Sequence, residues 1–279
     1  MRHLRWILVA WLCASAAVGQ EKTITLASTT STQNSGLYAA ILPAFQAATG
    51  IHVNVVAVGT GQALRIAQNG DADVLIVHHR PSEDAFVAAG YGIDRRDLMY
   101  NDFVIIGPSD DPASIRNAPN AAAALARIAA ERWLFISRGD DSGTHKRERE
   151  LWTLAALQPS GAWYREIGAG MGAALNMAAV TDAYTLADRG TWLSFGNKRG
   201  LARLFSGDPT LRNPYGMIRV NPARHPHVAA DDAKALADWL TSDTGQRAIA
   251  AFRVNEHQLF CPVAAAPRAT GICPPDQVE

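Results

Sequence analysis

Apolar and polar residues alternate along the chain in two rhythms. Short apolar runs, typical of buried strands, occupy 23–27, 51–58, 74–77, 103–108, 133–136 and 215–220. Apolar residues at three- and four-residue spacing predict helices at 37–49, 62–69, 83–89, 121–130, 146–155, 173–179, 233–240 and 245–252. The segment 184–195 is expected to begin extended and to end helical. This alternation predicts α/β architecture.

Residues 1–19 have the pattern of a secretory signal. Basic Arg2 and Arg5 precede an apolar run from Trp6 to Ala17, and small residues follow it. The run is shorter than the roughly 20 apolar residues that span a bilayer. A retained anchor or a buried amino-terminal helix is the alternative. We expect cleavage near Gly19/Gln20 and a mature protein in the periplasm.

The charge of the mature chain is close to balanced. Removal of Arg2 and Arg5 from the 26 basic residues leaves 24 against 26 acidic residues, a net charge of −2. A protein that binds nucleic acid or an anionic membrane surface normally shows a basic patch or run. We therefore expect neither partner, and an anionic ligand would have to be captured by local donors.

The mature chain, of about 260 residues, is longer than one typical domain. We expect two α/β lobes joined by two strands, one near 103–107 and one near 217–220. Lobe 1 would comprise 20–104 and 216–279, and lobe 2 would comprise 105–215. Ligands of open α/β sheets bind beyond the carboxyl ends of the strands, so the site is expected in the cleft between the lobes.

The segment from Ser137 to His145 reads Ser-Arg-Gly-Asp-Asp-Ser-Gly-Thr-His and follows a predicted strand. It places a guanidinium, small hydroxyls and a glycine amide at a helix start, where free N–H groups and the helix dipole favour anions. The candidate ligand-binding residues are Arg138, Ser142, Gly143 and Thr144. The alternatives are a helix cap and an ion pair from Arg138 to Asp140. An Asp140 that faced the ligand would instead require a protonated, phosphate-like anion.

A second group of hydroxyls lies at 28–32, directly after the first strand. Thr29, Thr30 and Ser31 are candidates for the opposite side of the same ligand, although such clusters also cap helices. Gly59-Thr60-Gly61 follows the second strand, and Thr60 is a further candidate in what could also be a simple turn. Two donor-rich turns suggest a ligand held from both sides.

Two other chemistries remain open in the sequence. The order Asp-Asp-Ser-Gly around Ser142 superficially resembles the nucleophile loop of a serine hydrolase, but one aspartate too many breaks that pattern. His78 and His79 are adjacent in a predicted strand end, so their side chains point to opposite faces and cannot chelate one metal together. His78 is expected to be partly buried, and a place in the lining of the cleft is the alternative. We expect no enzyme, no metal site and no cofactor.

Cys261 and Cys273 lie in a tail without an evident helix or strand pattern. Exported proteins meet oxidising conditions, so we expect these two residues to form a disulfide. Two free thiols are the alternative.

Six motifs occur in the order of a known family. They begin at Ser28-Thr-Thr-Ser-Thr-Gln-Asn-Ser-Gly, Val58-Gly-Thr-Gly-Gln-Ala, Asn69-Gly-Asp-Ala-Asp, Tyr100-Asn-Asp-Phe-Val, Ser137-Arg-Gly-Asp-Asp-Ser-Gly-Thr-His and Asp188-Arg-Gly-Thr. From about Lys22 to Phe260 the chain resembles the tungstate-binding proteins of bacterial ABC importers, within the wider class of molybdate-, sulfate- and phosphate-binding proteins.

The resemblance implies a two-lobed periplasmic binding protein of type II, which closes on an oxyanion and then docks on a membrane permease. It implies tungstate as the ligand, with molybdate bound more weakly, and a monomer. It also assigns ligand contacts to Thr29, Thr30, Ser31, Thr60, Arg138, Ser142, Gly143 and Thr144. A phosphate or sulfate receptor is the alternative within the class, and a secreted serine hydrolase is the alternative outside it.

Overall fold

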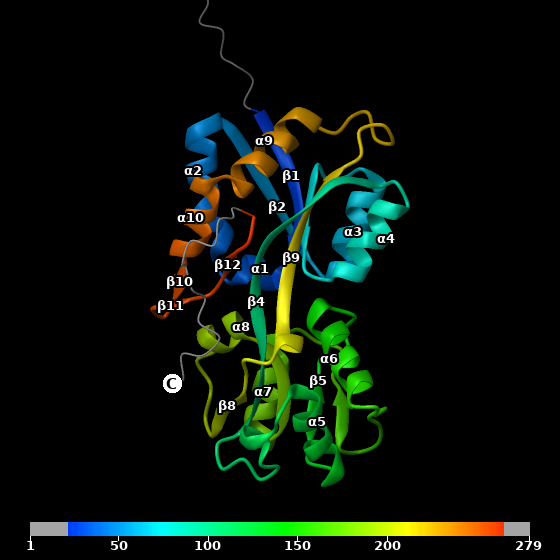
Figure 1. The fold of residues 1–279 in the computed structure, drawn as a ribbon, viewed down its shortest axis with the longest axis vertical. Coiled ribbons are helices and arrows are strands. Elements are labelled where there is room, and N and C mark those ends of the chain that lie inside the picture. The colour runs from blue at the N-terminus through cyan, green and yellow to red at the C-terminus, as the bar shows by residue number, and fades with distance from the viewer. Residues whose placement is uncertain (1–21, 265–279) are drawn as a thin grey trace, which may run out of the picture.

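The computed structural model describes residues 22–264 as two α/β lobes, one above the other along the long axis (Figure 1). The predicted signal at 1–19 lies outside the described residues. Two long neighbouring strands, β4 (Gly92–Pro108) and β9 (Arg212–Val220), run between the lobes. Within 22–264, no helix combines the length and the apolarity that a bilayer crossing requires. The predicted two-lobed α/β fold is confirmed.

The sheet of lobe 1 has the strand order β2-β1-β3-β9-β4. Strands β1 (Lys22–Thr29), β2 (Ile51–Val58) and β3 (Val74–Val77) are parallel, whereas β9 pairs antiparallel with both β3 and β4. The apolar residues of these strands alternate between two cores, as pleated strands require. Both faces of the sheet must therefore be covered by helices.

The helices of lobe 1 lie on the two faces. One core contains residues of α2 (Leu37–Thr49), α9 (Ala230–Thr241) and α10 (Asp243–Ala251), and the other contains residues of α3 (Thr60–Asn69) and α4 (Arg80–Ala88). A short helix, α1 (Thr30–Asn34), directly follows β1. Pro43 lies inside α2 without ending it. The cover on both faces leaves the strand ends to point at the second lobe.

Lobe 2 repeats this arrangement on the other half of β4. Its strands are β5 (Phe135–Ser137), β6 (Tyr164–Glu166), β7 (Tyr184–Asp188) and β8 (Leu201–Phe205). Helices α5 (Ala121–Ala130) and α6 (Gly143–Leu154) contribute to one core, and α7 (Met171–Thr181) and α8 (Arg189–Ser194) to the other. Short 3₁₀ turns occupy Ile115–Asn117 and Pro209–Leu211.

The crossover strand β4 belongs to both sheets. Its residues pack into the core of lobe 1 as far as Met99 and into the core of lobe 2 from Phe103. Leu211, just before β9, still belongs to the core of lobe 2, and Tyr215 on β9 belongs to that of lobe 1. The boundaries proposed at 104/105 and 215/216 fall within these two strands and stay a prediction. The apolar pattern predicted only the last third of β4.

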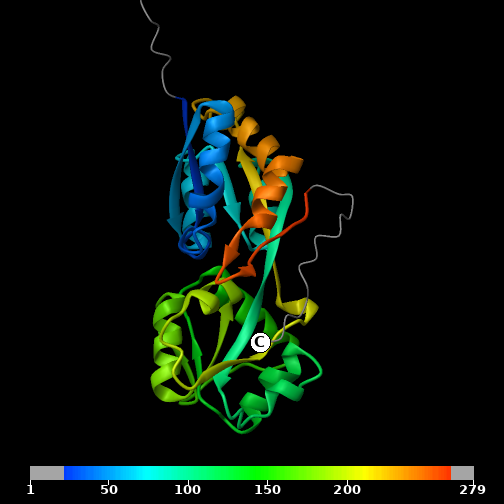
Figure 2. The same cartoon turned by 90° about the vertical axis from the view of Figure 1, so that its left-hand side faces the viewer.

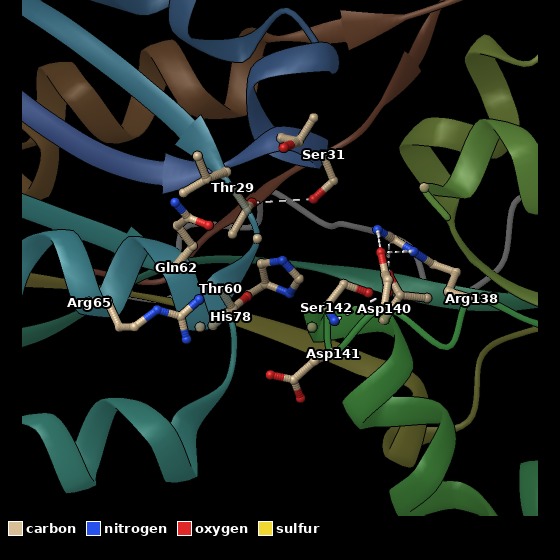
Figure 3. A pocket seen from close by; sticks show the side chains of 17 residues that line it. Thr29, Ser31, Thr60, Gln62, Arg65, His78, Arg138, Asp140, Asp141 and Ser142 are labelled. Carbon is tan, nitrogen blue, oxygen red and sulfur yellow. Dashed lines mark hydrogen bonds and ion pairs between the residues drawn. The ribbon is translucent and has the colours of Figure 1, made fainter. Parts of the chain in front are cut away.

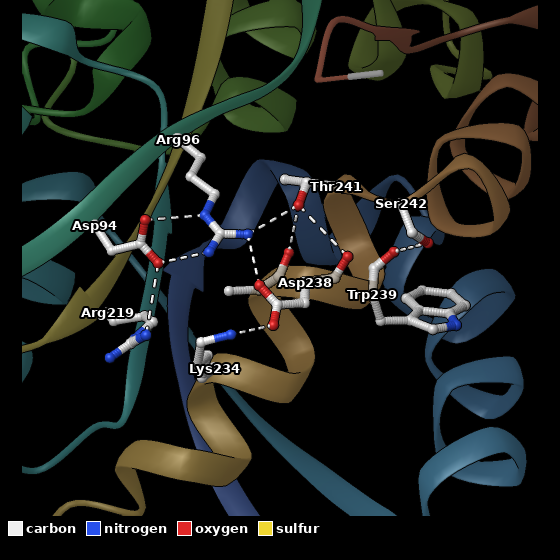
Figure 4. A network of polar contacts seen from close by, with 9 residues as sticks. Asp94, Arg96, Arg219, Lys234, Asp238, Trp239, Thr241 and Ser242 are labelled. Atoms are coloured by element: carbon white, nitrogen blue, oxygen red, sulfur yellow. Dashed lines mark hydrogen bonds and ion pairs between the residues drawn. The ribbon is translucent and has the colours of Figure 1, made fainter. Parts of the chain in front are cut away.

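The first half of β4 contains four consecutive charged residues, Asp94 to Asp97, and therefore has no apolar alternation. Arg96 on this strand forms ion pairs with Asp94 at 2.7 Å and with Asp238 of α9 at 2.9 Å (Figure 4). Arg219 of β9 lies 3.6 Å from Asp94, and Lys234 lies 2.6 Å from Asp238. These charges satisfy one another on the strand surface, so an extended segment forms without an apolar alternation.

The chain end contains strands that the sequence did not predict. β10 (Arg253–Val254) pairs with β11 (His257–Gln258), and β12 (Cys261–Pro262) pairs with β4 beside the crossover (Figure 2). Of these strands, only β12 lies in the tail that showed no evident strand pattern, because a two-residue strand leaves no periodic signal. Cys261 is buried and disulfide-bonded, while Cys273, its predicted partner, lies outside the described residues.

Candidate functional site

A pocket of about 370 Å³ lies between the lobes, where strands end and helices begin (Figure 3). Lobe 1 contributes the residues that follow β1, β2 and β3, and lobe 2 contributes those that follow β5 together with the start of α7. All eight residues predicted to bind the ligand line this pocket: Thr29, Thr30, Ser31, Thr60, Arg138, Ser142, Gly143 and Thr144. The sequence did not single out Val58, Gln62, Arg65 and Gly170.

The hydroxyl wall of lobe 1 is built on the end of β1. Thr29 is the last residue of the strand and is buried, and its Oγ1 lies 2.7 Å from Thr32 Oγ1 and 3.2 Å from Ser31 Oγ. Thr30, the first residue of α1, is exposed toward the pocket. The wall thus presents short hydroxyl side chains rather than charges.

Thr60 is the second contribution of lobe 1. It is the first residue of α3 and is only 1% exposed, yet its Oγ1 has no hydrogen-bond partner among residues 22–264. A buried hydroxyl without a partner costs free energy, which binding of an acceptor would recover. Within the described chain, neither α3 nor α7 has a side-chain cap at its start, and their N-cap residues Gly59 and Gly170 line the pocket.

The wall of lobe 2 is an internally bonded loop. Arg138 Nη2 donates to Asp140 Oδ2 at 2.5 Å, and Arg138 Nη1 donates to Thr144 Oγ1 at 3.4 Å. The Ser142 N–H donates to Asp140 Oδ1 at 3.2 Å. Burial opposes ionisation of Asp140, but the bonds from Ser142 and Arg138 outweigh it and hold the pKa of this carboxyl below its usual value. Asp140 therefore orients Arg138, as one of the two sequence interpretations proposed.

Two glycines allow the loop its close contacts. Gly139 has a φ of +61°, and a Cβ there would meet the Cβ of Glu166 at 2.7 Å. A Cβ on Gly143 would lie 2.4 Å from Cε1 of His78, across the cleft. Any side chain at Gly143 would therefore push the start of α6 away from lobe 1.

His78 lies on the floor of the pocket, immediately after β3. It is 6% exposed, and its Nδ1 lies 2.9 Å from Oδ1 of Asn213 on β9. Burial lowers the pKa of His78 to about 4, so the imidazole is neutral at physiological pH. His79 has different partners, Ser82 and Glu150, so the two histidines do not form one site. The strand-end position shared with Thr29 is the signal that could have identified His78.

The geometry around Ser142 does not resemble a catalytic nucleophile. Its Oγ accepts the backbone N–H of His145 at 3.3 Å and so caps α6. The ring of His145 instead accepts the Asp141 N–H at its Nδ1, and its Nε2 lies 3.4 Å from Glu166. In the described part of the chain, no group of three or more His, Cys, Asp or Glu side chains could hold a metal ion.

Comparisons with known proteins agree with this architecture. A family model described as the PBP superfamily domain matches residues 14–244. The tungstate-binding protein TupA of Peptoclostridium acidaminophilum is 47% identical over 247 residues, which cover 87% of this chain and 86% of that protein.

Two solved structures have the same fold and a similar sequence. The tungstate-binding protein TupA from Desulfovibrio alaskensis G20 superposes with a TM-score of 0.79 at 43% identity, over 88% of this chain and all of that one. The tungstate ABC transporter protein from Geobacter sulfurreducens gives a TM-score of 0.78 at 49% identity, over 84% of this chain and all of that one. The chain therefore belongs to the PBP superfamily and, within it, to the TupA family.

Proposed function

We propose that this protein is the extracytoplasmic solute-binding protein of an ABC importer and binds tungstate, with molybdate as a weaker ligand, in the pocket between its lobes. Relatives with the names tungstate-binding protein and tungstate ABC transporter cover most of the chain and support this function. They favour a binding protein over the serine hydrolase that the sequence left open. The residue roles below are part of the proposal.

One observation carries the proposal: the pocket is rich in donors, and its side-chain charges cancel. Among the described residues that line it, Arg65 and Arg138 balance Asp140 and Asp141. The additional positive potential comes from the starts of α3, α6 and α7, each equivalent to about +0.5 charge. Together they compensate most of the charge of a small dianion, which needs no lysine in the site.

The occupied carboxylate favours an anion without a proton. A protonated oxyanion such as hydrogen phosphate needs an acceptor, and the Asp140 carboxylate already uses part of its acceptor capacity on Arg138 and on the Ser142 N–H. A fully deprotonated tetrahedral anion needs only donors. Tungstate and molybdate satisfy this condition at neutral pH, so the phosphate alternative is not favoured.

We assign the charge to Arg138 and hydroxyl donation to Thr30, Ser31, Ser142 and Thr144. Thr144 accepts one bond within the loop, so its own O–H proton stays available for the ligand, whereas the Ser142 hydroxyl also bonds to Asp140 and has to turn from that carboxylate to the ligand. Backbone N–H groups near Ser31 and Gly143 would complete the cage. Seven bonds to a charged ligand contribute about 10–20 kcal/mol gross, against about 12 kcal/mol for nanomolar binding.

The location, the permease partner and the oligomeric state are further parts of this proposal, which membership of the family supports. The protein is expected in the periplasm after cleavage near Gly19/Gln20, and transport requires docking of the closed lobes on a membrane permease. Edman sequencing of the exported protein tests the cleavage site. Light scattering of the same sample tests whether it is a monomer.

A panel of oxyanions tests the ligand. Tungstate, molybdate, sulfate and phosphate are titrated in a calorimeter, and each is also added in a thermal unfolding scan, because a ligand of the folded state alone raises the Tm. We expect the tightest binding and the largest Tm increase for tungstate, followed by molybdate. Displacement of tungstate by equimolar phosphate or sulfate would refute the proposal.

A further inference from the structure

His78 is in contact with both lobes. Its ring projects from the end of β3 in lobe 1 and lies against Gly143 at the start of α6 in lobe 2. A methyl group added at Gly143 would lie 2.4 Å from Cε1 and 2.8 Å from Nδ1, distances that real Cβ contacts do not show. The imidazole therefore limits how closely this helix start approaches β3.

The ring is held in place by the crossover strands. His78 Nδ1 bonds to Oδ1 of Asn213, whose Nδ2 donates to Oδ1 of Asn101 at 2.7 Å and to the hydroxyl of Tyr215 at 3.3 Å. Asn101 and Asn213 are paired across β4 and β9, and both are buried. The Tyr215 ring also packs on the imidazole, with centroids 4.8 Å apart. The position of His78 is thus fixed by β4 and β9, the two strands that run between the lobes.

A second contact across the pocket is softer. A Cβ on Gly61 would meet Oδ2 of Asp141 at 3.3 Å, but the Asp141 side chain is 76% exposed and can move aside. His78 is 6% exposed and bonded to buried partners. Of these two contacts, only that of His78 can resist further closure.

We propose that His78 is a size-selecting stop, whose imidazole, held by Asn213 and Asn101, sets the final separation of the two walls and so favours a large tetrahedral oxyanion over a smaller one. Donors on both walls then reach tungstate, whereas a sulfate ion leaves the bonds to one wall too long to be effective. His78 acts here as a positioning residue, through the distance between Thr29–Ser31 and Arg138–Thr144. The inference rests on the proposed function.

Sulfate competition in the full-length exported protein tests the stop. The readout is the sulfate concentration that displaces half of the bound tungstate, for the wild type, His78→Ala and His78→Phe. We expect this concentration to fall by about tenfold in His78→Ala, the low end of what pocket size contributes to discrimination. His78→Phe keeps a ring but loses the bond to Asn213, so it should restore part of the wild-type value. If His78→Ala acted only by impairing the folding of the protein, His78→Phe would not restore the sulfate concentration.

Two further variants complete the design. Asn213→Ala frees the imidazole and should shift the same concentration in the same direction but by less, and His52→Ala on the outer strand β2 is a control that should change nothing. An unchanged sulfate concentration in His78→Ala, or no displacement at the solubility limit of the salt, overturns the inference. Equal loss in His78→Phe and His78→Ala also overturns it. A wild type that binds no tungstate refutes the proposed function instead.

Discussion

The two walls of the pocket differ in how far their donors are already engaged. In lobe 2, Arg138, Asp140, Ser142 and Thr144 are bonded to one another or to the backbone before any ligand arrives. In lobe 1, Thr29 and Ser31 bond to one another, but Thr60 is buried without a hydrogen-bond partner among the described residues, and α3 starts without a side-chain cap there. The lobe 2 wall is therefore pre-organised, whereas Thr60 and the start of α3 leave hydrogen-bond donors of lobe 1 unused.

The layers beneath the two walls differ as well. Behind the lobe 1 wall, Ser28 Oγ bonds to the Tyr38 hydroxyl at 2.6 Å and to the Ile76 carbonyl at 2.8 Å, a neutral network. Behind the lobe 2 wall lies Glu148, only 2% exposed, which accepts from Tyr164 at 2.7 Å and from the Trp152 indole at 3.2 Å. We infer that mutations in the lobe 2 wall change stability and binding together, whereas the unpartnered Thr60 hydroxyl of lobe 1 contributes to binding alone.

The largest expected effect is on the pH dependence of stability. Burial raises the pKa of Glu148 to about 7 from 4.5, so the folded state keeps a proton that the unfolded state loses. The stabilisation is complete below pH 4.5 and is lost as the pH rises through 7, an amount on the order of 3 kcal/mol. Urea unfolding at several pH values measures it as the difference between wild type and Glu148→Gln.

The difference between the two proteins is the decisive quantity, because Glu83 and Asp188 are also buried with raised pKa values. Those groups contribute equally to both proteins and cancel. A difference that stays constant across the pH range would show that Glu148 does not titrate between the folded and unfolded states.

Removal of the guanidinium is expected to have the largest effect on binding. Arg138→Ala should weaken tungstate binding by at least tenfold, about 1.4 kcal/mol, because a bond to a charged group contributes about 1.5–3 kcal/mol. It also leaves Asp140 without its cation. Calorimetry measures the change, and Arg138→Lys, which keeps the charge but not the planar fork, should recover part of it. Unchanged affinity in Arg138→Ala would contradict the assigned role.

A matched pair of hydroxyl deletions tests the contrast between the walls directly. Thr60→Val should weaken tungstate binding about tenfold with no loss of Tm, because the hydroxyl has no partner before binding. Ser142→Ala should lower both the affinity for tungstate and the Tm, since the cap of α6 contributes about 1 kcal/mol to stability. Calorimetry and thermal unfolding give the two quantities for each variant. The contrast fails if Thr60→Val is the less stable protein.

The smallest expected effect concerns a contact between the walls at the rim. His79 Nε2 lies 3.2 Å from Glu150 Oε1 of α6, and their side chains are 16% and 37% exposed. Partly exposed pairs contribute about 0–1 kcal/mol, so Glu150→Gln should speed tungstate dissociation by no more than about fivefold. Stopped-flow displacement measures the rate, and a double-mutant cycle with His79→Gln isolates the pair. If the two mutations change the logarithm of the dissociation rate additively, a bond between His79 and Glu150 across the cleft is excluded.

The sequence predicted the lobe 2 wall more completely than the rest of the site. Arg138 to Thr144 are contiguous, so one motif contains the guanidinium, the hydroxyls and the helix start. His78 and Asn213 meet only because β3 and β9 are neighbours, a relation between segments far apart in the chain. The local sequence around His78 therefore could not indicate Asn213 as its hydrogen-bond partner.

The same distinction explains the fold. Strands with apolar alternation, such as β2, were predicted with their bounds, and α5 was predicted to the residue. The first half of β4 was missed because ion pairs with α9 and β9 replace apolar contacts there. β12 was missed because its pairing with β4, not its composition, makes it a strand.

The place of β9 in the sheet has a consequence for biosynthesis. It lies between β3 and β4, although the whole core of lobe 2 precedes it in the chain. A chain that is still being synthesised therefore leaves an edge of β3 unpaired until residues 212–220 are present. An open edge invites pairing with other chains. Completion of this sheet thus depends on residues 212–220, and a product truncated before residue 212 is the form most prone to aggregate.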